Sequence, residues 1–149
     1  MDPSIFVLVG ICLLVIGGAI SHFLGEYRFK KKVSEGLKIK TQRGDSVQSH
    51  GEKIIANHLF QNNIRYVYDI PMRLSFFQYK KIRPDFFLPE LDIYIEYWGM
   101  KGDPNYDRKT EWKTSLYTKY NKKLISLYSY QKDQIPSILD REIKKLSSI

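Results

Sequence analysis

The sequence predicts an α/β domain in which helices cover a mixed β-sheet, preceded by one transmembrane helix. Three observations lead to this fold class. An uncharged apolar stretch opens the chain, and helical and strand-like hydrophobic spacing alternate through the remainder. Hydrophobic residues make up 43% of the 149 residues and aromatic residues 14%, which is enough for a packed core and excludes a disordered chain. The length allows one compact domain plus an anchor.

The first predicted element is the apolar stretch 5–24, IFVLVGICLLVIGGAISHFL, which has about the length that a helix needs to cross a bilayer. A signal peptide would carry basic residues before its apolar stretch, whereas here the basic residues follow it. A helix on the surface of a small domain would be amphipathic, and this stretch is apolar on all sides. We therefore expect residues 1–24 to form an uncleaved transmembrane anchor.

Residues 25–48 are polar, basic and poorly periodic, and we interpret them as a linker. Under the positive-inside rule their cations stay in the cytoplasm, which predicts a single-pass protein with its N-terminus outside and its domain in the cytoplasm. The formal net charge of +8 favours an anionic partner, either nucleic acid or acidic membrane lipid. The linker cations would contact lipid headgroups or steer DNA, or they are simply a solvated charge run. The single cysteine, Cys12, excludes a disulfide framework and a cysteine-based zinc site.

The third predicted segment, 49–149, is the folded domain. A helix is expected over 49–62, where Ile55 and Leu59 follow helical spacing and Ser49 to Glu52 form a capping box. The chain then becomes aromatic and β-branched, with Pro71 as a break, and strands are expected at 65–70, 73–79, 83–88 and 92–98. A helix over 103–120, a strand over 123–128 and a helix over 135–146 complete the α/β order.

Two acidic residues interrupt the apolar strands. Alternation along 92–98 places Ile93, Ile95 and Tyr97 on one face and Tyr94, Glu96 and Trp98 on the other. A carboxylate in so apolar a strand is costly to bury unless a cation satisfies it. Asp85 lies in a similar place, directly before Phe86-Phe87-Leu88, although an aspartate at a strand edge paired with Arg83 is the simpler alternative.

Carboxylates that converge from two strands are suitable ligands for Mg²⁺ or Mn²⁺, which retains water and takes other ligands from a substrate phosphate. Asp85 and Glu96 are the expected ligands. Glu52 is a third candidate, because it shares a helical face with Ile55 and Leu59 and so points towards the sheet. Its alternative is purely structural, since the fourth residue of Ser-x-x-Glu caps its own helix.

These residues resemble the PD-(D/E)XK phosphodiesterase superfamily, which includes restriction endonucleases and very-short-patch repair nucleases. The resemblance covers about residues 49–134 and is greatest to small domains found alone or attached to DNA helicases. It implies a restriction-endonuclease-like fold and metal-dependent cleavage of nucleic acid. The residues that match are Glu52, Asp85, Glu96, Gly99, Met100, Tyr106, Lys113 and Tyr117.

The lysine of the superfamily pattern is absent from its usual place two residues after the glutamate, where this chain has Trp98. The resemblance implies that this lysine has moved into the next helix, with Lys113 as the candidate and Lys109 as the reserve. Lys113 is otherwise one more solvated lysine. The tyrosines of that helix and Trp112 are packing residues or base-stacking platforms, and we expect packing. His50 and His58 are expected at the surface.

Three functions follow as hypotheses. The first is a Mg²⁺-dependent endonuclease that acts on DNA rather than RNA, with Glu52, Asp85, Glu96 and Lys113 as catalytic residues. The second is a catalytically inactive domain of the same fold that tethers nucleic acid at the membrane. The lack of catalysis would follow from Trp98 in place of the strand lysine. The third is a membrane-anchored interaction module whose basic linker binds anionic lipid.

Overall fold

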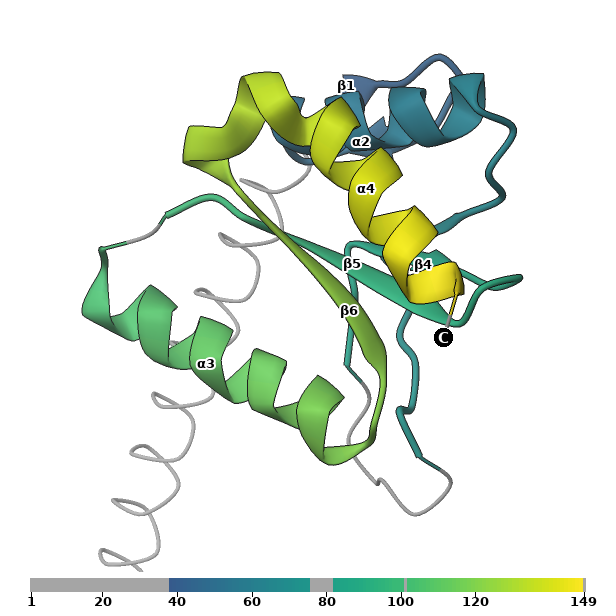
Figure 1. Cartoon of the computed structure of the whole chain (residues 1–149). Helices are drawn as coiled ribbons and strands as arrows, with labels where there is room; N and C mark the ends of the chain where they lie inside the picture. The colour runs from purple at the N-terminus through teal and green to yellow at the C-terminus, as the bar shows by residue number, and fades with distance from the viewer. Residues whose placement is uncertain (1–37, 76–81, 101, 149) are drawn as a thin grey trace, which may run out of the picture. The chain divides into compact units, whose positions relative to one another are not determined.

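A computed structural model of the chain describes residues 38–75, 82–100 and 102–148 (Figure 1). The chain divides into two compact units, Met1–Lys38 and Ile39–Ile149, and all described residues except Lys38 belong to the second unit. The predicted transmembrane helix lies outside the described residues. Among the helices that are described, none is both long and apolar enough to cross a membrane.

The second unit alternates helices and strands in an α/β order, as the sequence predicts. Its elements are β1 (Ile39–Lys40), β2 (Ser46–Val47), α2 (His50–Gln61), β3 (Val67–Tyr68), β4 (Phe86–Leu88), β5 (Ile93–Trp98), α3 (Pro104–Lys119), β6 (Lys123–Tyr128), the 3₁₀ helix η1 (Ser129–Gln134) and α4 (Ile135–Ser147). The helices expected over 49–62, 103–120 and 135–146 and the strand expected over 123–128 are confirmed.

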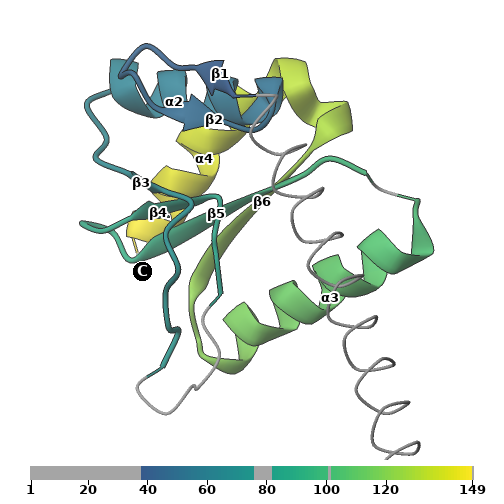
Figure 2. The ribbon, with the colours of Figure 1, turned by 180° about the vertical axis from the view of Figure 1, so that it is seen from behind.

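The main sheet is mixed and has the strand order β3-β4-β5-β6. β4 runs antiparallel to β3 and β5, whereas β6 runs parallel to β5. Because parallel neighbours need a crossover connection, the chain passes from β5 through α3 to β6. Figures 1 and 2 show α2 and α4 together on one side of the sheet and α3 on the other. The prediction of a mixed sheet flanked by helices is confirmed.

The two faces of the sheet pack against separate apolar clusters. Ile93 and Ile95 of β5 belong to the larger cluster, under α2 and α4, and Tyr97 packs against it. Tyr94 belongs to the smaller cluster, under α3, together with Tyr117. The alternation expected for this strand is therefore confirmed, and residues of β5 with even numbers face α3.

The hairpin of β1 and β2 lies where the sequence indicated a linker over 25–48. Val47 is fully buried, and β1 and β2 both contact α2. Arg43 donates to Asp45 at 2.8 Å, and its guanidinium lies 3.6 Å from the centroid of the Tyr66 ring. Arg43 and Asp45, both within 25–48, therefore make contacts inside the folded unit. The strands have two residues each, too short for a hydrophobic period to reveal them.

The strands before Asp85 are shorter than expected. β3 covers only two residues of the expected strand 65–70, since Asp69 has a positive φ of 48° and Pro71 cannot donate a ladder hydrogen bond. Of the strand expected over 73–79, residues 76–79 lie outside the described ones, and the neighbouring Met72 forms an isolated bridge with Ile82. β4 begins at Phe86 rather than residue 83, after Pro84, which also lacks a donor.

Candidate functional site

The site is built where β4 begins and β5 ends. The antiparallel register pairs Phe86 with Ile95, and its continuation by one residue sets Asp85 opposite Glu96. Residues directly opposite in such a pair project from the same face. Asp85 Oδ2 accepts a hydrogen bond of 2.7 Å from the backbone N–H of Tyr97, which holds its carboxylate beside the strand. Both carboxylates thus lie on the face covered by α3.

Glu96 is a buried carboxylate with a hydrogen-bond donor on each of its oxygens. Its side chain is 1% exposed, and the Lys113 ammonium lies 2.7 Å from Oε2. The hydroxyl of Tyr117 donates to Oε1 at 2.5 Å. Burial raises the pKa of Glu96, while the charge and hydrogen bond of Lys113 act in the opposite direction. The strand therefore retains an acid because α3 supplies its partners.

Lys113 extends from α3 to the strand ends rather than into solvent. Its ammonium donates to the backbone oxygen of Arg83 at 2.6 Å as well as to Glu96. It also lies 5.8 Å from the ring centroid of Trp98, the residue at the usual lysine position of the superfamily. The reserve candidate Lys109 is exposed. Of these two lysines, Lys113 is the one that meets the carboxylates.

Asp85 has less cationic support than Glu96. Burial and then the charge of Glu96 raise the pKa of Asp85 to about 7, against the opposing N–H of Tyr97 and the Lys113 charge. The alternative pairing with Arg83 is not formed, because Arg83 binds Asp69 at 2.8 Å. Two close carboxylates therefore share one ammonium, which leaves the site with excess negative charge.

Glu52 lies at the start of α2 and is 8% exposed. Its oxygens accept from the Ser49 hydroxyl at 2.8 Å, the Gln48 backbone N–H at 2.9 Å and the Tyr68 hydroxyl at 2.6 Å. Ser49 in turn accepts from the backbone N–H of Glu52, so Ser49 caps the helix, and the Glu52 carboxylate supports that cap through the Ser49 hydroxyl and the Gln48 N–H. Its charge also contributes to the raised pKa of Asp85, so it acts on the site electrostatically.

A close approach sets α2 against the end of β5. A Cβ atom on Gly51 would lie 2.0 Å from Cζ of Tyr97, so only glycine permits this distance. Tyr97 is also the residue whose N–H binds Asp85. The start of α2, with Glu52, is therefore held next to the carboxylate pair by the fit of one ring against one glycine.

The carboxylate pair matches part of the donor set of a divalent cation. Among residues 38–75, 82–100 and 102–148, no group of three or more acidic, histidine or cysteine side chains is arranged to hold a metal ion. Mg²⁺ commonly needs only one or two carboxylates, with water and substrate phosphate as its other ligands. Each carboxylate oxygen has two lone pairs, so the bonds to Lys113 and Tyr117 leave acceptor capacity on Glu96. The excess negative charge at Asp85 suits a cation.

The remaining candidates have structural contacts. The hydroxyl of Tyr106 accepts from the Gly99 backbone N–H at 2.9 Å, and Tyr117 is buried in the cluster under α3. His58 pairs with Asp140 at 2.7 Å. The bond between Tyr117 and Glu96 was not predicted, although Tyr117 follows Lys113 by one helical turn and so shares its face.

Comparisons of the chain with protein-family models, with curated proteins and with solved structures give no match.

Proposed function

We propose that the chain is a membrane-anchored, Mg²⁺- or Mn²⁺-dependent phosphodiesterase of the PD-(D/E)XK type that cleaves nucleic acid, with DNA as the expected substrate. The observation that supports this proposal is the meeting of Asp85, Glu96 and Lys113 on one face of the sheet. A buried carboxyl group and a partly buried one, both with raised pKa values and both beside a lysine, are typical of catalytic sites. The membrane anchor and the cytoplasmic location of the domain are parts of the same proposal.

The proposed ligands of the cation are Asp85 and Glu96, with Glu52 adding negative charge behind them. When bound, the cation would polarise a phosphoryl oxygen of the substrate and acidify water. The ammonium of Lys113 would orient the attacking water and stabilise the charge that develops on the phosphoryl group. Tyr117 would keep Glu96 oriented through its hydrogen bond.

A second candidate function, binding without cleavage, is favoured by a different observation. Both oxygens of Glu96 already accept hydrogen bonds from α3, and Trp98 replaces the strand lysine. A domain arranged in this way would tether nucleic acid at the membrane through its basic surface. Such a tether would bind DNA in a salt-sensitive way, and the binding would persist without a divalent cation.

A nicking assay on supercoiled plasmid with the full-length chain separates the two functions. We expect Mg²⁺-dependent nicking by the wild type, and a loss of about 100-fold or more in Asp85→Asn and in Glu96→Gln. Asp92→Asn is the matched control, because Asp92 is a turn aspartate paired with Lys122. Activity that survives both carboxylate substitutions would rule out the proposed hydrolase, whereas metal-independent binding without nicking would support the tether.

A further inference from the structure

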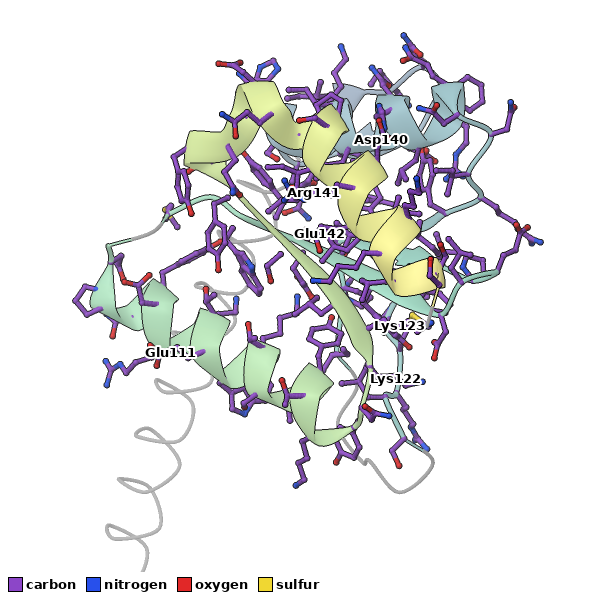
Figure 3. All side chains as sticks on the ribbon, viewed as in Figure 1. Glu111, Lys122, Lys123, Asp140, Arg141 and Glu142 are labelled. Atoms are coloured by element: carbon purple, nitrogen blue, oxygen red, sulfur yellow. The ribbon has the colours of Figure 1, made fainter. Side chains whose placement is uncertain are left out.

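A cleft of about 230 Å³ lies beside the proposed site, and none of the roles above uses it. It is lined by Trp98, Tyr106, Asp107, Thr110, Glu111 and Tyr128. Trp98 connects the cleft to the site, because its ring lies 5.8 Å from the Lys113 ammonium and it follows Glu96 on the same face of β5. Figure 3 labels Glu111 on α3, the helix that also carries Lys113.

The walls of the cleft are aromatic and its charged groups are acidic. Three of the six lining side chains are aromatic rings, and the only charged ones are Asp107 and Glu111. Carboxylates repel a phosphate but accept hydrogen bonds from N–H groups. The cleft thus excludes the phosphate backbone and suits a flat ring that carries donors. Its volume is below the roughly 300–1,000 Å³ of pockets for drug-sized ligands, so the ligand must be small.

The position of the cleft narrows the choice of ligand. Trp98 lines the cleft, and its ring lies 5.8 Å from the ammonium of Lys113, where the proposed function puts a phosphate of the substrate. A nucleobase next to that phosphate offers a flat face and N–H donors together.

We infer that the cleft binds one unpaired nucleobase of the substrate strand, next to the phosphate at the proposed site, and that it prefers guanine to thymine. Guanine presents two adjacent N–H donors to a carboxylate, whereas thymine has a single N–H donor. A second aromatic surface adjoins the cleft, where Tyr130 stacks on Tyr128 with ring centroids 5.4 Å apart. Tyr130 is 67% exposed.

This inference rests on the proposed nucleic-acid substrate, but its test does not depend on cleavage. The full-length chain is titrated in EDTA against two labelled single strands, one of thymine only and one with a single central guanine, and binding is followed by fluorescence anisotropy. Guanine should strengthen binding about fivefold or more, the lower end of the discrimination that a paired base edge provides. Failure of nicking with this preference intact would reject the hydrolase alone.

Two substitutions that each remove one carboxylate test whether the preference for guanine depends on Glu111. Glu111→Ala should reduce the affinity ratio of the two strands to about one, whereas Glu90→Ala should leave the ratio unchanged. Glu90 is exposed in the turn between β4 and β5, at the opposite end of β5 from Trp98. Both variants remove one negative charge, so the affinity ratio of the two strands, rather than the overall affinity, is the informative quantity.

Several results of the binding assay would contradict a base-binding cleft. Equal affinity of the wild type for the two strands, binding to neither strand, or a preference that survives Glu111→Ala would each overturn the inference. Displacement of the guanine strand by choline chloride, but not by NaCl of equal ionic strength, would also overturn it, since choline is an alkylated ammonium. Trp98 fluorescence supplies an independent signal. The variant Trp112→Phe removes the only other tryptophan of the sequence. In this variant, the fluorescence of Trp98 should change when the guanine strand binds and not when the thymine strand binds.

Discussion

Asp85 and Glu96 are neighbours with unequal stabilisation. Glu96 has an ammonium and a phenol, each within 2.7 Å of one of its oxygens. Among the described residues, the Asp85 carboxylate accepts a short hydrogen bond from the backbone N–H of Tyr97. The negative charge that lacks compensation is therefore concentrated at Asp85. Without a bound cation, the pKa values of both carboxyl groups are raised, and that of Asp85 rises to about 7.

The first prediction concerns the stability of the metal-free protein. The folded-state pKa of Asp85, about 7, exceeds the ordinary value of 3.8, so the folded protein holds this proton more tightly than the unfolded chain does. The resulting stabilisation is complete below about pH 4 and is lost as the pH rises towards 7. Asp85→Asn removes this dependence. Thermal unfolding in EDTA should show the variant gaining stability relative to the wild type across that interval.

Magnesium provides the complementary measurement for Asp85. At pH 8 we expect Mg²⁺ to raise the Tm of the wild type, because a ligand that binds only the folded state stabilises it. Asp85→Asn should show a much smaller rise, and Asp92→Asn should respond as the wild type does. Equal shifts in all three proteins would contradict a cation site at Asp85.

The second prediction concerns the pair of Lys113 and Glu96. Lys113→Met leaves a carboxylate of 1% exposure without its counter-charge, which typically costs about 3–5 kcal/mol. The double variant Glu96→Gln/Lys113→Met should lose less, because the unpaired charge is gone. Urea unfolding at pH 8 measures both. Lys109→Met, at an exposed position, should stay within about 0.5 kcal/mol of the wild type.

At the scale of elements, the contact between the start of α2 and the end of β5 positions Glu52 near the pair. The third prediction is that Gly51→Ala destabilises the protein by about 1–3 kcal/mol, since its Cβ would overlap the Tyr97 ring and force the helix away from the strand. Gly99→Ala is the control, because a Cβ there meets nothing within 4 Å. Chemical denaturation of both variants provides the comparison.

The long elements were predictable because their periodicity is local. α3 and β6 show their spacing within their own residues, and the alternation of β5 places Glu96 on the face of α3. The hairpin of β1 and β2 was not predictable, since β2, which carries the buried Val47, packs against α2, and no spacing within its own segment encodes that contact. The early end of β3 likewise depends on a positive φ at Asp69, which hydrophobicity does not encode.

The partners of the site residues were predictable only in part. Helical spacing and the superfamily resemblance led to Lys113, and the structure places it on Glu96. The Tyr68 hydroxyl on Glu52 and the Asp69 carboxylate on Arg83 join residues from separate segments, and no spacing rule connects them. The cleft beside Trp98 also combines β5, α3 and β6, so it exists only once the sheet has formed.

For the whole molecule, the net charge of +8 sets the strength of non-specific binding. The fourth prediction is that DNA affinity falls by at least about tenfold between roughly 50 and 200 mM salt, even if as few as two phosphates are neutralised. Anisotropy titrations in EDTA measure this dependence. The affinity ratio between guanine and thymine strands should stay constant over the same range, since both strands carry the same phosphates.

The alternation of β5 also limits how the gene can vary. One residue inserted into β4 or β5 would rotate every later side chain of that strand to the other layer. With one residue inserted in β5 before Ile95, Glu96 would enter the aliphatic layer under α2, while Ile95 would meet the ammonium of Lys113. One-residue insertions should therefore be tolerated in surface turns and lost from β4 and β5. Deep sequencing of an insertion library after selection for folded protein would measure this difference.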